Sequence, residues 1–364
     1  MYKRQVLAGF SCSMEDDAIM NDVEKGIEEA TEAYTVLDFG VAFNEMATKA
    51  STTVVPGEDR PATGDENNDE KKISEVSVFL LEDGKVIGIL IPQNRNQVSS
   101  NSDGSITLKD LKFVTKYKTN RTLEAHVVIN GNQFLKNINI GDAQSALNQQ
   151  ISGCLSADQL IKYGSTRIVF GKDITNSYSS PSVAENNPTT ILVKVSHVAA
   201  RLDFSQFDVT LKGFEGNPTV VFDEAKFVNL QQNGKIVEGD ASVNVKDGAF
   251  LNRSNRIGTK WTDMGTAYGY ANQYKQDSEM NTALYTKFTV DGRTFEKTYP
   301  INPAGITKEV DHNGIKGGYL YDIKVRWTIT PDWGDSTIEF YTRDWVHNCL
   351  LYTSPSPRDM RRSR

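Results

Sequence analysis

Histidine is the side chain best suited to proton transfer near neutral pH, and the chain has four, widely separated: His126, His197, His312 and His347. A hydrolase holds a nucleophile beside a base, and the sequence contains no G-x-S-x-G segment. His197 stands in an apolar strand pattern, which is typical of a packed side chain. A glycosidase, a further alternative, would need two carboxylates roughly 5 to 10 Å apart in a cleft. We therefore expect no enzyme and no cofactor.

Acidic residues in the segment DENNDE (65–70) suggest a second kind of chemistry, calcium binding. Asp65, Asn67 and Asp69 alternate as in a calcium loop, but Glu70 stands where the glycine of such a loop is expected. Charge runs of this kind are usually solvated, and we interpret this one as loop charge. No His, Cys or carboxylate pair stands at zinc-ligand spacing, so we predict no metal site.

Aromatic residues cluster in WTDMGTAYGYANQY, at Trp261, Tyr268, Tyr270 and Tyr274. Such a cluster can form a glycan-stacking face, or it can pack onto a β core, where Tyr and Trp are common. A surface lipoprotein that binds glycans through these residues is therefore an alternative function.

Composition excludes several classes of protein. Hydrophobic residues make up 38% and charged residues 24% of the 364 residues, which suits a folded chain of about two domains. The formal charge of −7 favours no nucleic-acid partner. Cys12, Cys154 and Cys349 are an odd set without C-x-x-C spacing, so we predict no disulfide framework. Cys154 is expected to be a small buried residue.

Both ends look foreign to the fold. MYKRQ and the tail LLYTSPSPRDMRRSR resemble translated sequencing-adapter sequence. We interpret 1–33 as an artefactual start, a signal-peptide remnant and an acidic tether, and 349–364 as a non-native tail.

Strand patterns fill most of the remaining chain. In the first half they cover 34–44, 73–91, 105–117, 123–132 and 165–171, with Asp83-Gly84 as a hairpin turn. A long exposed loop is expected over 47–72, within reach of proteases. The segment 141–151 is the best helix candidate, with Asp142 as N-cap, and the turn-rich 176–188 is expected to be a linker.

The second half repeats the strand pattern. Strands are predicted over 189–211, 219–231, 282–301, 318–330 and 336–346, and Asp291-Gly292 is another hairpin turn. Many short strands and few helices favour an all-β protein with two β-sandwich domains, 34–188 and 189–348. A sandwich that gives up an edge strand exposes a groove that a neighbour's strand can fill.

An ordered set of segments resembles the Bacteroidales-type fimbrillin family, the subunits of type V pili. The set consists of LAGFSC followed by SMEDD, YTVLDFGVAF, ISEVSVFLLEDGKVIG, LEAHVVINGNQFLKNINIGDAQSALNQQI, TTILVKVSHVAARLDF, GGYLYDIKVRWTI and STIEFYTRDWVHN. This resemblance implies two transthyretin-like Greek-key β-sandwich domains, with a short helix in the first.

The resemblance also implies a route of assembly. Cys12 would carry lipid, and an arginine-specific protease would cut between Arg60 and Pro61. The cut would free a first strand that includes Val36, Leu37, Phe39, Val41 and Phe43. A donor strand at about 336–348, with Ile338, Phe340, Tyr341 and Trp345, would then fill the groove of the next subunit.

The partners implied are other copies of the chain, other fimbrial subunits, the protease, and the outer membrane through the lipid anchor of the precursor. The expected location is the cell surface, in a fimbrium that supports adhesion. Because Pro61 follows Arg60, an uncleaved, anchor-like subunit is a second expectation.

Overall fold

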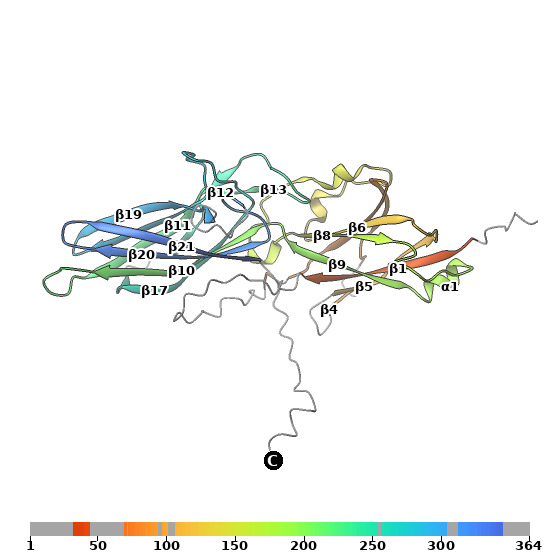
Figure 1. Ribbon diagram of the computed structural model, residues 1–364, viewed down its shortest axis with the longest axis horizontal. Coiled ribbons are helices and arrows are strands. Elements are labelled where there is room, and N and C mark those ends of the chain that lie inside the picture. The colour runs from red at the N-terminus through yellow and green to blue at the C-terminus, as the bar shows by residue number, and fades with distance from the viewer. Residues whose placement is uncertain are drawn as a thin grey trace, which may run out of the picture.

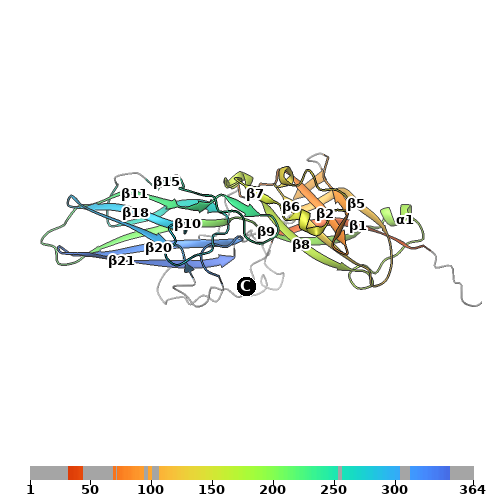
Figure 2. The ribbon, with the colours of Figure 1, turned by 90° about the horizontal axis from the view of Figure 1, so that it is seen from above.

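The computed structural model describes residues 32–43, 69–70, 72–93, 97–100, 106–252, 256–303 and 312–344. These residues form an elongated, nearly all-β molecule, with the strands up to β9 in one half and the strands from β10 in the other (Figures 1 and 2). The all-β prediction is confirmed.

The first half is a sheet path of eight strands in the order β3-β2-β6-β8-β9-β1-β5-β4. The strands are β1 Tyr34–Phe43, β2 Val76–Glu82, β3 Lys85–Leu90, β4 Val98–Ser100, β5 Ile106–Lys116, β6 Thr122–Ile129, β8 Lys162–Val169 and β9 Thr189–His197. Only Lys162 and Tyr163 of β8 pair with β9. The path therefore folds at this joint into two facing layers, which share one apolar core.

Local sequence explains the β2–β3 hairpin. Asp83 and Gly84 both have positive φ, 49° and 71°, as a two-residue turn between twisted strands requires. The run VSVFLL is buried at every position because β2 packs on both faces. Val78 and Leu80 join the core of the first half, whereas Phe79 and Leu81 join a separate apolar cluster on the other face, which is described below.

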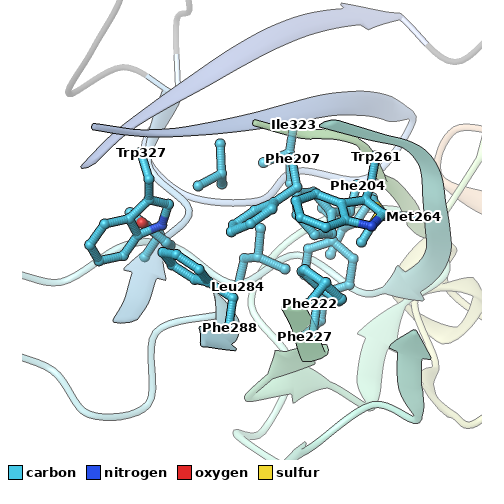
Figure 3. Close-up of a cluster of buried hydrophobic side chains, with 14 of the residues drawn as sticks. Phe204, Phe207, Phe222, Phe227, Trp261, Met264, Leu284, Phe288, Ile323 and Trp327 are labelled. Atoms are coloured by element: carbon cyan, nitrogen blue, oxygen red, sulfur yellow. The ribbon is translucent and has the colours of Figure 1, made fainter. Parts of the chain in front are cut away.

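The second half is a sandwich of a four-stranded sheet, β17-β10-β20-β21, and a sheet ordered β15-β11-β18-β19, in which β16 also pairs with β11. The strands are β10 Ala200–Leu211, β11 Val220–Val228, β15 Phe250–Asn252, β16 Arg256–Ile257, β17 Lys260–Gly269, β18 Ala283–Val290, β19 Arg293–Pro300, β20 Tyr319–Ile329 and β21 Gly334–Asp344. Its core is rich in aromatic rings, with Phe207 within 5.6 Å of the rings of Phe222, Phe288 and Trp261 (Figure 3).

A third apolar cluster joins the halves. It contains Phe79, Ile151, Ala199, Tyr270 and Leu320, which come from both halves. Short paired strands support it: β7 Gln150–Ser152 with β13 Asn233–Lys235, and β12 Leu230–Gln231 with β14 Val245–Lys246. Because this cluster is continuous across the junction, a division into two independent domains stays a prediction.

The strand that follows the predicted boundary at 188/189 belongs to the first half by its pairing. Strand β9 lies in the sheet of the first half, parallel to β1, and the chain enters the other half only at Ala200. The expected linker, 176–188, contains the helix α1 Pro181–Glu185, which packs against β1 and β5. The Ser180 hydroxyl caps this helix by accepting from the Val183 N–H, and Ala184 is fully buried.

The helix predicted over 141–151 is wrong. That segment holds only the 3-10 turn Gln144–Leu147 and the start of β7. The Val86 N–H donates to the Asp142 carbonyl, and the Gln144 N–H donates to the Gly84 carbonyl. These bonds to the β2–β3 hairpin use the backbone groups that a helix needs, and Asp142 accepts from the Asn139 N–H instead of acting as an N-cap.

Candidate functional site

Strand β1 lies in the interior of its sheet. It pairs in parallel with β9 along Leu37–Phe43 and antiparallel with β5 along Tyr34–Val41 (Figure 1). At its start, Tyr34 exchanges two backbone hydrogen bonds of 2.8 Å with Tyr178. This strand, the first of the described residues, is thus held on both sides.

The side chains of β1 form the middle of the core. Val36, Leu37, Phe39 and Val41 are each 0% exposed. Leu37, Phe39 and Val41 belong to the first core together with residues of β2, β5, β6 and β8. Phe43 lies in β1 by its backbone, opposite Val195. Four of the five residues predicted to leave with the strand are therefore fully buried.

The covalent link between β1 and β2 runs through residues 44–68, which lie outside the described residues. Cys12, Arg60, Pro61 and Trp345, predicted to be the lipidation site, the cleavage site and part of the donor strand, lie outside the described residues as well.

The chain that follows this link is fixed by Glu70, and the prediction that DENNDE is solvated loop charge is wrong at this residue. The Glu70 side chain is 0% exposed and accepts from Arg201 Nη1 at 2.9 Å and from the Tyr268 hydroxyl at 2.5 Å. Its backbone carbonyl accepts from Lys162 Nζ at 2.8 Å. Two residues further along, the side chain of Asn130 holds the chain again. Its amide nitrogen donates to the Lys72 backbone carbonyl, and its side-chain oxygen accepts from the Ser74 N–H. We call Glu70, Lys162, Arg201 and Tyr268 the Glu70 clamp.

The clamp contains titratable groups from both halves. Burial lowers the pKa of Lys162 to about 8, and the Glu70 carboxylate partly offsets this shift. Burial also holds the pKa of His197 well below its usual range, and the Lys162 charge adds to that effect. His197 is thus a buried, neutral side chain, which agrees with its prediction as a packed residue.

The predicted donor strand matches β21, which pairs antiparallel with β20 along its whole length. Within the described part of the chain β21 is the last strand of its sheet, so only one of its sides is paired. Ile338 is partly buried against the core of the second half, and Phe340 and Tyr341 lie opposite Ile323 and Asp322 in the register. β1 is therefore interior and β21 peripheral.

Three of the four residues of the aromatic cluster are engaged inside the protein. Trp261 is 4% exposed and packs against Phe207 and Phe222, and Tyr270 is 1% exposed and donates to the Gly153 carbonyl. Tyr268 belongs to the Glu70 clamp. The rings of Trp261 and Tyr270 therefore fill apolar cores instead of facing solvent, and glycan binding stays an alternative prediction.

One open hollow, between the β2–β3 turn and the end of β5, contains carboxylates. Glu82 accepts two hydrogen bonds from Arg121, at 2.6 and 2.8 Å, and Arg121 lowers the pKa of the Glu82 carboxyl. A glycosidase acid needs a raised pKa, so this carboxylate is unsuited to that role. In the ranges that the structure covers, no group of three His, Cys, Asp or Glu could hold a metal ion, and no helix is long and apolar enough to cross a membrane.

Cys154 is a half-buried free thiol, and burial raises its pKa. It accepts a contact of 3.2 Å from the Gln133 amide nitrogen. A raised pKa keeps the thiol protonated and unreactive, in line with the structural role predicted for it.

No protein-family model matches the sequence, and no curated protein matches it. Among solved structures, the chain is similar to a "putative cell adhesion protein" from Parabacteroides distasonis, with 17% identity and a TM-score of 0.57, over 86% of this chain and 98% of that one. It is also similar to a fimbrilin from Porphyromonas gingivalis, with 15% identity and a TM-score of 0.48, over 87% of this chain and 99% of that one. At these identities the likeness concerns the fold, and this chain has the all-β fold of the Parabacteroides protein.

Proposed function

We propose that the chain is a structural fimbrial subunit that polymerises by donor-strand exchange. The observation that carries the proposal is the place of β1: it fills the interior of the sheet, yet a single cut in residues 44–68 separates it from everything that follows. The shared fold with a cell adhesion protein and the ordered segments that resemble fimbrillins support the same function.

Once β1 has left, a groove filled by another strand is lower in free energy than an empty groove. Full burial of one large apolar side chain stabilises a fold by about 1.5 to 3 kcal/mol. Val36, Leu37, Phe39 and Val41 together thus contribute roughly 6 to 12 kcal/mol, which is comparable with the whole stability of a typical domain, about 5 to 15 kcal/mol. A chain that has lost β1 needs another strand in its place.

The Glu70 clamp suits this mechanism because it holds the chain on the far side of the cut. After cleavage at Arg60 the new N-terminal stub would remain attached at Glu70, and β2 would keep its place. The start of the chain beyond the cut would therefore stay anchored to the second half while the groove left by β1 is open.

Export and anchoring complete the proposal. Cys12 carries lipid in the precursor, which holds it at the outer membrane until the cut after Arg60 releases the segment that bears the lipid. The mature subunit then belongs to a fimbrium at the cell surface that supports adhesion.

The decisive experiment treats the purified full chain with an arginine-specific protease and examines it by SDS electrophoresis without boiling. We expect a new N-terminus at Pro61 and an SDS-resistant ladder of oligomers. The Arg60→Ala chain is the matched control and should remain intact and monomeric. A chain that is cut at Arg60 but retains β1 as a monomer would contradict the proposal.

The donor strand and the lipid anchor have separate tests. Deletion of residues 336–348 should abolish the ladder after normal cleavage, and ordinary polymers from that deletion would contradict the role of β21. Cys12→Ala should abolish membrane attachment of the precursor in a host that processes lipoproteins, as measured by fractionation.

A further inference from the structure

Strands β1 and β21 share a sequence pattern. Residues 35–39 read TVLDF and residues 336–340 read STIEF. Position by position, each segment has a hydroxyl residue, a β-branched residue, an aliphatic residue, an acid and a phenylalanine. The pattern covers both faces of a strand, because successive side chains point to opposite faces.

The β1 segment with this pattern is buried on both faces. Thr35, Val36, Leu37 and Phe39 are each 0% exposed, so a strand that replaced β1 would need matching volume at each of them. The acid is the exception, since Asp38 is only partly buried and its carboxylate accepts from the Phe39 N–H. A chemically matched replacement therefore needs side chains of the right type for four buried positions and an acid at the fourth position of the segment. Residues 336–340 of β21 have side chains of these types in this order.

We propose, on the basis of the strand exchange described above, that β21 of a second copy enters the groove in the register of this pattern. Ile338 then takes the place of Leu37, Phe340 takes the place of Phe39, and the strand runs in the direction of β1, parallel to β9. Further along, Thr342 takes the place of Val41, and Thr and Val have nearly the same shape.

The opposite direction fits less well. It would place Phe340 at the site of Leu37 and Ile338 at the site of Phe39. One site would then be overfilled and the other left with a void, and both faults destabilise a packed core. Side-chain volume thus selects the parallel direction.

A third segment, 200–204, reads ARLDF and shares the aliphatic–acid–Phe triplet. It begins β10, which occupies in its own sheet the place of β1, with one parallel neighbour, β20, and one antiparallel neighbour, β17. The chain continues from both ends of β10, and Arg201 is held in the Glu70 clamp. This copy of the pattern is therefore fixed in place, and β21 is the copy placed to serve as the donor.

Position 40 marks where the match becomes imperfect. Tyr341 would stand where β1 has Gly40, and a Cβ there lies 3.2 Å from Leu192 Cδ1 and 3.3 Å from the Ile106 carbonyl. The Leu192 side chain is 51% exposed and has room to turn, while the carbonyl must shift by a few tenths of an ångström. The tyrosine ring would then cover Leu192, an apolar side chain that β1 leaves open to solvent.

Disulfide trapping tests the register. In β1, Thr35 lies opposite Thr115 of β5, and Leu37 lies opposite Phe113. In a background with the three cysteines of the chain changed to serine, a Ser336→Cys chain is mixed with a Thr115→Cys or a Phe113→Cys chain, and the mixture is cleaved and oxidised. We expect an intersubunit disulfide with Thr115→Cys and at least about tenfold less with Phe113→Cys.

The outcomes separate the register from the function. SDS-resistant polymers whose disulfides favour Phe113→Cys, or form with neither partner, would overturn the register and leave strand exchange standing. Absence of polymers from the cleaved wild-type chain would overturn both. The expected pattern of disulfides in polymers supports both.

A peptide of residues 334–344 provides a second test that does not depend on folding of the variants. Present during cleavage, it should enter the vacated groove and suppress the ladder. Because a Phe-to-Ala change leaves a cavity in a packed core, the Phe340→Ala peptide should be at least about tenfold less potent. A peptide with the same composition and reversed order is the control for direction, and equal potency of the reversed peptide would overturn the proposed direction.

Discussion

Glu70 and Arg201 are 131 positions apart in the chain, yet a carboxylate oxygen of Glu70 lies 2.9 Å from Nη1 of Arg201 at the junction of the two halves. The carboxylate is fully buried and the guanidinium is 15% exposed. Arg201 also donates to Asp203 at 2.9 Å, so its charge is shared between two acids. The pair fixes the start of the chain after residues 44–68 to the second half.

Glu70→Ala should destabilise the protein by about 3 to 5 kcal/mol, because it leaves Arg201 buried without this partner. Urea denaturation measures the loss. Lys72→Ala is the matched control, since Lys72 pairs with Asp158 at 3.3 Å while both side chains are largely exposed, 51% and 42%. Solvent screens that exposed pair, so its loss should be much smaller than that of Glu70→Ala. Equal losses in the two variants would contradict the buried role of Glu70.

The lowered pKa of Lys162 predicts how the free energy of unfolding changes at alkaline pH. Its folded pKa, about 8, lies below the ordinary 10.5, so between these values the unfolded chain binds more protons than the folded chain. Stability should therefore rise with pH across this window, by up to about 1.4 kcal/mol per pH unit, as the buried ammonium loses its charge. The neutral amine can still donate to the Glu70 carbonyl.

The measurement is the free energy of unfolding from pH 7.5 to 9.5, compared with the Lys162→Met variant. The difference between wild type and variant should shift in favour of the wild type as pH rises. A constant difference over this range would show that Lys162 is not the group responsible.

The strands of the core were predictable from sequence because their signals are local. YTVLDFGVAF is β-branched and aromatic along its length, and the strand expected over 34–44 is observed at Tyr34–Phe43. Asp83-Gly84 and Asp291-Gly292 need only their own backbone to turn, and all four residues have positive φ.

The clamp was beyond prediction because nothing near Glu70 in sequence reveals its partners. Lys162, Arg201 and Tyr268 stand 92, 131 and 198 positions away. A dense polar run is normally solvated, and only the tertiary fold buries its last acid. The helix expected at 141–151 failed for a related reason, since the backbone of that segment bonds to a distant hairpin.

Gly164 should be among the least replaceable glycines of the described chain. It follows the two residues of β8 that pair with β9, and a Cβ there would lie 1.8 Å from the Lys194 carbonyl oxygen and 2.9 Å from Val195 Cα. Both obstacles are backbone atoms, so the sheet would have to open where its two layers meet.

Gly164→Ala should therefore cost about 3 kcal/mol in thermal or urea unfolding. Gly84→Ala is the control, because Gly84 has a φ of 71° but no heavy atom within 4 Å of the added Cβ. It should lose only about 1 to 2 kcal/mol, from backbone strain alone. The reverse order of the two losses would contradict the close approach of β8 and β9.

Phe39→Ala distinguishes the role of β1 before and after assembly. Phe39 is fully buried in the first core, and truncation of such a ring costs about 3 to 5 kcal/mol through lost burial and the cavity left behind. Urea denaturation of the uncut chain should show this loss. If β1 leaves on maturation, polymers grown from the Phe39→Ala chain should resist SDS and heat as wild-type polymers do, because the altered residue is no longer part of them.

Leu192→Ala, on the neighbouring strand β9, is the control, since its 51% exposed side chain should contribute little to the uncut chain. Polymers weakened by Phe39→Ala as strongly as the uncut chain would mean that β1 remains in its groove.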